Sequence, residues 1–447
     1  MVDLDPILKR AYWALAGLGG VYTIFLLCLT NHSLQRHALY AHKFHTGFWH
    51  DIDNPESFGF AKNQVTPFNL TTPDGETLYC WHILPLDVYA EHEREITAQP
   101  SGPADDLTKT VGYKLLKADP KSRVIINFHG NAGHVAQGWR TNTYASLTTL
   151  AHTHILTCDY RGFGRSTGTP TEPGLLTDGI ALTHFVLHTL SHPSTRTLLL
   201  GQSLGTAITA GVALHYADPG SPALPAAIAR PPAAGGKGGG GPQRFAGVVL
   251  VAAFPSLPEL LKTYRIGGFL PVLSPLRPYP YLTSLLEKRV VDTWATGARM
   301  AALVGAAGRG GVGVRVTVLH ARDDGDISWK LGEEVFKGME RVMMGEEGVV
   351  RTDERRSVLG RERVTRGAVV YRAVEDWAGS AERVVELEVV RHGGEFGAVS
   401  YSPMQRFGEG WMAGLDVYNI ALTGTGHNRI MTFAPVALAV TRAFESV

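Results

Sequence analysis

The sequence predicts an α/β fold in which helices cover both faces of a mostly parallel sheet, preceded by one transmembrane helix. Short apolar runs suited to buried strands alternate with longer runs suited to helices, and this alternation is typical of parallel sheets. A twenty-residue stretch without charge, 11–30, precedes them. We therefore expect a tail (1–10), a transmembrane anchor (11–30), a juxtamembrane linker (31–59) and a folded domain (60–447).

The uncharged stretch AYWALAGLGGVYTIFLLCLT is long enough to cross a bilayer as a helix, and Lys9 and Arg10 precede it. A cleaved signal peptide is one alternative, but its apolar core would be shorter and a small-x-small cleavage site should follow, where this chain has CLTNHSLQRH. A buried helix of a globular domain is the other. We expect a single-pass signal anchor.

The orientation in the membrane is indicated less clearly. The two basic residues before the anchor nearly balance the two that follow it, Arg36 and Lys43. Asn69-Leu-Thr71 is an acceptor sequon for N-glycosylation. We therefore expect a protein of the endoplasmic reticulum membrane with a lumenal domain, and a cytosolic domain stays the alternative.

Composition excludes several classes of partner. The formal net charge is +1, and no basic patch is interleaved with aromatic residues, so nucleic acid is not an expected partner. Cys28, Cys80 and Cys158 lie in apolar or strand-like runs, and we expect them to be buried thiols rather than a disulfide framework. No Cys/His cluster has zinc-ligand spacing, and we expect neither a metal nor a cofactor.

The elements of the domain follow in order. QVTPFNLTTPDGETLYCWHILP contains two β-rich runs joined by PDG, which predicts a hairpin. After it, strands and helices are expected to alternate over SRVIINF, residues 139–151, HILTCDY, residues 172–190, RTLLLG, LGTAITAGVALHYA, GVVLVAAF and VRVTVLHA.

Three stretches interrupt the alternation. Residues 217–243 are a Pro/Gly/Ala-rich loop of low complexity. Residues 254–293, rich in Pro, Leu, Tyr and Phe, do not fit a sheet element and are expected to form a helical cap. Residues 345–410 begin with a charge-dense segment and are expected to be an insertion, either a solvated one or a partner-binding arm.

The pattern G-x-S-x-G occurs twice, around Ser203 and around Ser166. A nucleophilic serine of this type needs a strand running into the turn and a helix leaving it. Ser203 follows TLLLG and precedes an Ala-rich apolar run, whereas TGTPTEPG, a loop-like stretch, follows Ser166. We expect Ser203 to be the nucleophile and Ser166 to be a structural residue.

Such a serine needs a base, and the base needs an acid that orients it. The strand VRVTVLHA runs into an acidic loop with three candidate acids: Asp323, Asp324 and Asp326. His427 lies between a Gly-rich turn and an apolar C-terminal helix, and we prefer it as the base to His392, which no helix follows.

An oxyanion needs backbone N–H donors aimed at it. The residue after the nucleophile, Leu204, is one expected donor. The turn FHGNAGH, directly after a strand, supplies the other, and we assign it to Asn131.

Taken together, HGNAG, DYRGFGRSTGTPTEPG, GQSLGTA, LHARDD and GHN resemble the membrane-anchored α/β-hydrolase-domain serine lipases of the monoacylglycerol and lysophosphatidylserine lipase type. The resemblance covers roughly residues 60–340 and the last thirty, and it implies the α/β-hydrolase fold. It also implies that Asp324, four residues past the His at the strand end, is the acid, and that Asp323 folds the turn. Gln202, where a His is frequent, and the two insertions depart from the pattern.

The expected function is hydrolysis of carboxylic esters of single-chain lipids, monoacylglycerols or lysophospholipids, at the membrane. The cap offers apolar side chains for an acyl chain, and each buried methylene contributes about 0.8 kcal/mol. A protein depalmitoylase or other thioesterase is one alternative. The resemblance implies that thioesterases of the family are held on the cytosolic face by lipidated cysteines, and no Cys cluster occurs near this N-terminus. A non-catalytic binding protein of the same fold is another, although such proteins usually lose a catalytic residue.

Overall fold

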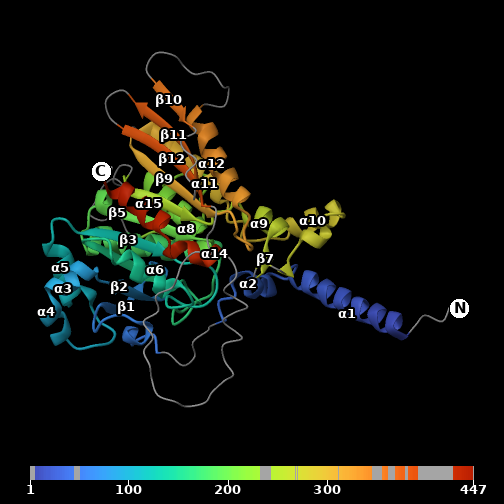
Figure 1. Cartoon of the computed structure of the whole chain (residues 1–447), viewed down its shortest axis with the longest axis horizontal. Coiled ribbons are helices and arrows are strands. Elements are labelled where there is room, and N and C mark those ends of the chain that lie inside the picture. The colour runs from blue at the N-terminus through green and yellow to red at the C-terminus, as the bar shows by residue number, and fades with distance from the viewer. Residues whose placement is uncertain are drawn as a thin grey trace.

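The computed structural model describes residues 6–44, 51–231, 243–266, 268, 270–310, 312–344, 355–360, 368–377, 381–390 and 426–445. Its centre is a ten-stranded sheet with the order β1-β2-β4-β3-β5-β6-β9-β12-β11-β10 (Figure 1). The strands are β1 (Val65–Thr71), β2 (Thr77–Ile83), β3 (Arg123–Phe128), β4 (Thr153–Cys158), β5 (Thr197–Gln202), β6 (Gly247–Val251), β9 (Val314–Ala321), β10 (Arg355–Gly360), β11 (Ala368–Trp377) and β12 (Ala381–Val390).

The six strands from β4 to β12 in this order are parallel neighbours. β1 and β2 form the antiparallel hairpin that the PDG turn predicted, with Val65 opposite Ile83. β2 then pairs antiparallel with β4, and β12, β11 and β10 continue antiparallel at the other edge. The predicted mostly parallel sheet is therefore confirmed.

Helices cover both faces of the sheet, as predicted. Two separate apolar clusters of buried side chains lie on the two faces. One is built largely from α7 (Glu172–His184), α8 (Leu204–Ala217), α11 (Thr296–Gly310) and α12 (Trp329–Met344). The other is built largely from α6 (Arg140–Leu147) and α15 (Ala434–Glu445). The shorter helices are α3 (Leu86–Glu91), α4 (Glu93–Ala98), α5 (Val111–Ala118) and α14 (Gly426–Arg429).

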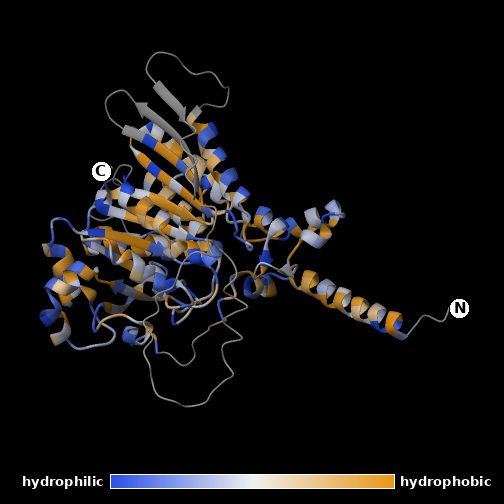
Figure 2. Ribbon diagram, viewed as in Figure 1, coloured by the Kyte–Doolittle hydropathy of each residue, from blue (hydrophilic) through white to orange (hydrophobic). Residues whose placement is uncertain are grey.

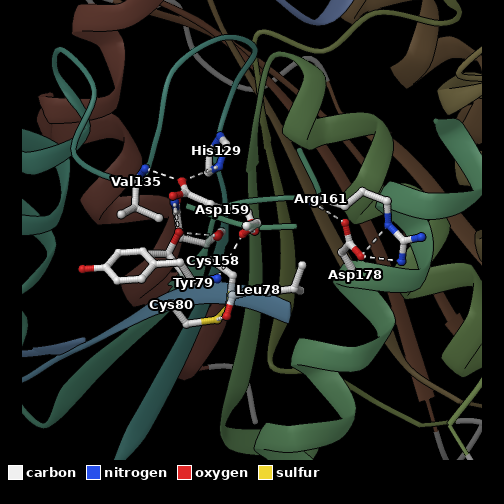
Figure 3. Close-up of a disulfide and its surroundings, with 12 residues drawn as sticks. Leu78, Tyr79, Cys80, His129, Val135, Cys158, Asp159, Arg161 and Asp178 are labelled. Atoms are coloured by element: carbon white, nitrogen blue, oxygen red, sulfur yellow. Dashed lines mark hydrogen bonds and ion pairs between the residues drawn. A yellow bond between two sulfur atoms is a disulfide. The ribbon is translucent and has the colours of Figure 1, made fainter. Parts of the chain in front are cut away.

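The expectation of free thiols at Cys80 and Cys158 is wrong, because the two form a disulfide. β2 and β4 are far apart in sequence but adjacent in the sheet, and their register sets Cys80 directly opposite Cys158 with the Cα atoms 4.0 Å apart. Both side chains are buried in the same cluster (Figure 3). Only the pairing of strands, which the sequence does not display, brings them together. Cys28 is free.

The N-terminal apolar stretch forms α1 (Pro6–Cys28), which begins five residues earlier than expected and extends away from the domain (Figure 1). It is long and apolar enough to cross a membrane, and its window of highest hydropathy has no buried residue. Figure 2 shows apolar residues along its length. The linker expected at 31–59 is not wholly extended, because α2 (His32–Tyr40) begins there, with Asn31 accepting hydrogen bonds from Ser33 N and Leu34 N.

The stretch expected as a cap contains α9 (Leu257–Thr263), the two-stranded ribbon β7 (Arg265–Ile266) and β8 (Leu270–Pro271), and α10 (Pro280–Glu287). Leu260 and Leu261 of α9 are buried in the main apolar cluster. Tyr281 of α10 is 79% exposed. The stretch therefore has a buried side against the domain and an apolar side that faces outward.

The stretch 345–410 is described only in part, and the described part is not a separate insertion. β10, β11 and β12 extend the central sheet, and β12 lies parallel beside β9. β12 is the β-like run before His392, which we assigned to the insertion rather than to the central sheet. Glu386 and Glu388 alternate with its apolar side chains, yet both are buried, and Glu388 accepts a hydrogen bond from Arg442 at 2.9 Å. His392 and residues 391–410 lie outside the described residues, as do residues 232–242 of the loop 217–243.

Candidate active site

Ser203 occupies the turn between β5 and α8, with φ 52° and ψ −119°. This is a conformation that non-glycine residues rarely adopt, so it requires support from the surrounding backbone. Ser203 N donates to Val251 O at 2.9 Å. A Cβ atom at Gly205 would lie 2.0 Å from Phe128 O, and one at Gly201 would lie 2.4 Å from Gly205 O. Both glycines are therefore needed for the strand and the helix to meet this closely.

Ser166 has a structural role, as predicted. Its side chain is buried, its hydroxyl donates to Asp159 O at 2.7 Å, and it accepts from Tyr79 N at 3.0 Å. The hydroxyl thus fastens its loop to the end of β4 and to β2. Gly164 and Gly168, the flanking glycines, have positive φ angles of 47° and 86° and belong to loop rather than to a strand–helix turn.

Asp324 and His427 are in direct contact, although 103 residues separate them. His427 Nδ1 lies 2.8 Å from Asp324 Oδ2. Asp324 Oδ1 accepts from the backbone N–H groups of Asp326 and Ile327 at 3.0 and 2.8 Å, which fixes the carboxylate in its turn after β9. His320 Nε2 lies 3.4 Å from Asp324 Oδ2. Of the three candidate acids, Asp324 is the one for which this contact with His427 is found.

Asp324 and His427 each shift the pKa of the other. Burial disfavours the imidazolium of His427, but the Asp324 carboxylate outweighs burial and raises the pKa of His427 to about 8. Burial likewise opposes ionisation of Asp324, but His427 and His320 lower the pKa of its carboxyl below the ordinary value. Asp324 therefore stays ionised at neutral pH, and it holds the Nδ1 proton of His427, which leaves Nε2 as the nitrogen that can accept a proton.

Gln202 connects this pair to the serine turn. Its Nε2 donates to His427 O at 3.2 Å and to Asn428 Oδ1 at 3.2 Å, and Gln202 directly precedes Ser203. The guanidinium of Arg429 lies 5.2 Å from the centre of the Trp139 ring. The short helix α14 that carries His427 is thus fastened both to the serine turn and to the segment before α6.

The turn after β3 lies against Ser203. A Cβ atom at Gly130 would lie 3.5 Å from Ser203 Cβ. The backbone carbonyls of this turn point to the buried side chain of Arg140, whose Nη2 donates to Gly130 O, Asn131 O and Ala132 O at 2.8 Å each. In a trans peptide the N–H points opposite to the C=O. Because the guanidinium draws the carbonyl oxygens of the turn to one side, the N–H groups of the same peptides favour the other side. Within the described residues, the backbone N–H groups of Asn131 and Leu204 have no hydrogen-bond acceptor assigned.

Buried polar side chains lie next to this turn, and Figure 3 shows two of them, His129 and Asp159. His129 Nδ1 lies 2.8 Å from Gly130 O, and its Nε2 lies 3.8 Å from Asp159 Oδ1. Asp159 Oδ1 also accepts from Val135 N at 2.6 Å. Burial raises the pKa of Asp159 to about 7, and burial together with Arg140 holds the pKa of His129 well below its ordinary value. Asp159 directly follows Cys158, so these side chains lie beside the strand pair that the disulfide joins.

A cavity of about 780 Å³ is lined by residues of α2, α7 and α11, among others. Ser203, Asp324 and His427 are not among its lining residues. It contains charged groups of both signs, among them Arg161, Glu172 and Arg299. No group of three or more His, Cys, Asp or Glu side chains placed to hold a metal ion occurs within the part of the chain that the structure describes.

Two residues of the site were not anticipated as contributors. Arg140 was unremarkable in the sequence, because its role depends on three carbonyls that only the folded turn presents to it. Gln202 was noted only as a departure from a family pattern, and its contact with His427 spans 225 residues. Asn69, the glycosylation candidate, is exposed on the edge strand β1, where a glycan has room.

Comparison with known proteins gives relatives for part of the chain. No protein-family model matches it. Among curated proteins it is similar to lysophosphatidylserine lipase ABHD12 of Danio rerio, with 25% identity over 190 residues, which is 42% of this chain and 45% of that protein. It is similar also to protein ABHD12B of Homo sapiens, with 37% identity over 99 residues, which is 22% of this chain and 26% of that protein. The chain therefore spans less than half the length of these curated relatives.

Among solved structures, an alpha-beta hydrolase from Vibrio vulnificus aligns with a TM-score of 0.44 and 14% identity, over 71% of this chain and 83% of that one. The resemblance that the motifs indicated is confirmed by the curated relatives. The chain has the α/β-hydrolase fold, as the strand order and the strand–serine–helix turn indicate, and it is similar over part of its length to the ABHD12 proteins.

Proposed function

We propose that the protein is a serine ester hydrolase in which Ser203, His427 and Asp324 form the catalytic triad. His427 Nε2 removes the proton from Ser203 Oγ as the oxygen attacks the acyl carbon, and the carbonyl oxygen becomes an oxyanion. The N–H groups of Leu204 and Asn131 donate to that oxyanion. Collapse of the intermediate breaks the ester bond, and the leaving alcohol takes the proton from His427. Water then releases the fatty acid from the acyl-enzyme by the same route.

One set of contacts carries this proposal. The Asp324–His427 pair at 2.8 Å is fastened, through the Gln202–His427 hydrogen bond, to the residue before a serine with positive φ. A buried ion pair alone is often structural. A buried pair bonded to a strained serine turn between a strand and a helix has the parts that acyl transfer requires.

We propose single-chain lipids, monoacylglycerols or lysophospholipids, as the substrate class. The printed name of one relative, a lysophosphatidylserine lipase, supports a lipid ester. The apolar cap segment, with Leu260 and Leu261 facing the domain and Tyr281 facing outward, supports it as well. The cationic side chains of the cap, Lys262, Arg265 and Arg277, are candidates to meet a phosphate, although Lys262 is paired with Glu259 and Glu287.

We also propose that α1 anchors the protein in the endoplasmic reticulum membrane and that the domain is lumenal. Two features support this orientation. A buried disulfide, Cys80–Cys158, fits an oxidising compartment better than the cytosol. The sequon at Asn69 is exposed, as a glycosylated asparagine must be.

The experiment that tests the activity pairs the two G-x-S-x-G serines. Wild type, Ser203→Ala and the matched control Ser166→Ala are treated with a fluorophosphonate probe and assayed on lipid esters. We expect Ser203→Ala to lose labelling and to lower turnover by several orders of magnitude. Ser166→Ala should still be labelled. Labelling that survives in Ser203→Ala and disappears in Ser166→Ala would refute the proposal.

A further inference from the structure

The C-terminal end of α2 is bonded directly to the turn that carries Asn131. Asn131 Nδ2 donates to Leu39 O, and Ala132 N donates to Tyr40 O at 3.2 Å. The last carbonyls of a helix have no partner within the helix. Here the chain leaves the helix at Ala41, with φ 45°, and the turn after β3 supplies donors to two of those carbonyls.

The side chain of Tyr40 secures this contact from the inside. It is 1% exposed, and its hydroxyl donates to Asp292 Oδ2 at 2.6 Å. Burial and Asp292 raise the pKa of Tyr40 well above its ordinary value, so the hydroxyl stays a donor at any pH of interest. Its ring packs edge-on against Phe163 and Trp294, with centroids 6.3 Å away in each case.

This packing reaches the buried side chains next to the same turn. Phe163 contacts His129 with ring centroids 5.9 Å apart, and His129 Nδ1 lies 2.8 Å from Gly130 O. Tyr40 therefore acts on the turn by two routes. Its backbone carbonyl accepts from Ala132 N, and its ring packs on Phe163, which contacts His129.

The turn needs such support because its backbone is strained. Ala132 and Gly133 both have positive φ, 62° and 67°, and a non-glycine residue in this region is strained. Arg140 holds the carbonyls of the turn from one side. α2 takes up the Asn131 side-chain amide and the Ala132 N–H on the other. None of these contacts uses the backbone N–H of Asn131, the proposed oxyanion donor.

α2 also follows directly on the C-terminal end of α1, the proposed membrane helix. Three residues separate the two helices, and Leu29 among them is buried in the main apolar cluster. Gln35 of α2 donates to Arg289 O and accepts from Val291 N in the part of the cap that follows α10. Gln35 and Leu39 also line the 780 Å³ cavity. Of the residues of α2, Tyr40 is the most buried, with 1% of its surface exposed.

We propose that α2 positions the oxyanion hole and that Tyr40 is the residue that holds α2 in place. The helix next to the proposed membrane anchor would then determine kcat. This inference rests on the proposed function. Tyr40 touches neither substrate nor Ser203 in this account and acts through the turn at Asn131. The consequence is that anchoring and catalysis form one structural unit.

The test uses the full-length protein in detergent, with Tyr40→Ala, Tyr40→Phe and Asn131→Ala. Tyr40→Ala removes the ring and loosens α2, and we expect kcat to fall about 10- to 100-fold while KM changes less than about threefold. Tyr40→Phe keeps the ring and should retain most of kcat. Tyr22→Phe is the matched control, because it deletes only the hydrogen bond from α1 to Val272 O at 2.8 Å.

A second readout separates positioning from general loss of structure. A trifluoromethyl ketone forms an oxyanion on the serine, so its affinity should fall by the same factor as kcat in Tyr40→Ala. The affinity of an uncharged ether analogue of the substrate should not change. If Tyr40→Ala does not fold, Asn131→Ala decides, because it deletes one side-chain hydrogen bond and should lower kcat and ketone affinity together by about tenfold.

Unchanged kcat in a folded Tyr40→Ala and in Asn131→Ala would overturn the inference. So would a loss of kcat without a matching loss of ketone affinity. These results are distinct from failure of the proposed function, in which wild type itself would show no ester hydrolysis and no labelling of Ser203.

Discussion

Replacing Asp324 by Asn should lower kcat and change the pH dependence of the reaction. Asn keeps an oxygen for the backbone N–H groups of Asp326 and Ile327. Its NH₂ group, however, cannot accept from His427 Nδ1 as the carboxylate does, so the ring is held in the wrong tautomer. A substitution of this kind lowers kcat about 10⁴-fold in a comparable triad, and we expect a loss of about 10³- to 10⁴-fold.

The pH effect follows from the pKa of His427. It is raised from 6.5 to about 8, a preference for the imidazolium of about 2 kcal/mol. Only the neutral ring accepts the serine proton, so roughly one enzyme in ten is active at pH 7, and kcat/KM should rise through pH 8 to a plateau. Without the Asp324 charge, burial remains and lowers the pKa. The midpoint of the acid limb should therefore move down by about one unit or more.

The assay measures kcat/KM of wild type and Asp324→Asn on one soluble ester between pH 5.5 and 9.5, with circular dichroism as the control for folding. A folded variant whose acid limb stays at pH 8, or moves to higher pH, would refute the assignment of Asp324 as the group that raises the pKa of His427. His427→Ala in the same assay should abolish the limb together with the activity.

Other predictions follow from the fold and the site. Gly205→Ala would place a Cβ atom 2.0 Å from the backbone of β3, so thermal denaturation should show a loss of about 1–3 kcal/mol or failure to fold. Removing the disulfide by Cys80→Ala with Cys158→Ala should cost about 2–4 kcal/mol in chemical denaturation, and reductant should then no longer lower the melting temperature. Asn69→Gln should abolish a mobility shift on glycosidase treatment, whereas protease access to the domain in sealed microsomes would indicate a cytosolic domain. Fatty-acid release should be faster for long single-chain lipids than for short water-soluble esters or diacyl phospholipids, and a rate that peaks at acetyl or butyryl esters would contradict a lipid substrate.

The features that depend on local sequence were predictable. One short segment, residues 197–217, contains the whole serine turn. TLLLG forms the strand, the Ala-rich run after Ser203 forms the helix, and Gly201 and Gly205 let the two approach closely. The hairpin at PDG and the alternation of strands and helices are local as well, and both agree with the structure. Each follows from rules on periodicity and turn chemistry that need no knowledge of distant residues.

The features that depend on contacts between distant parts of the chain could not be predicted from the sequence. Cys80 and Cys158 meet only because β2 and β4 are neighbours in the sheet. β12 was a β-like run in the sequence, but its glutamates, which are buried in the fold, gave no sign that it belongs to the central sheet. Arg140 and Tyr40 have ordinary sequence surroundings. Gln202, although it lies in the serine motif, gave no sign of its contact with His427. The fold alone brings their partners to them.

The most direct measurement of the central claim, that Ser203 attacks the acyl carbon, is to trap the acyl-enzyme. Wild type is mixed with a long-chain monoacylglycerol, quenched in acid within the first turnovers and digested, and the peptides are mapped by mass spectrometry. We expect an acyl mass increment on the peptide that contains Ser203, and none on that peptide from Ser203→Ala. An acyl increment on the peptide that contains Ser166, or rapid ester hydrolysis by Ser203→Ala, would contradict the claim.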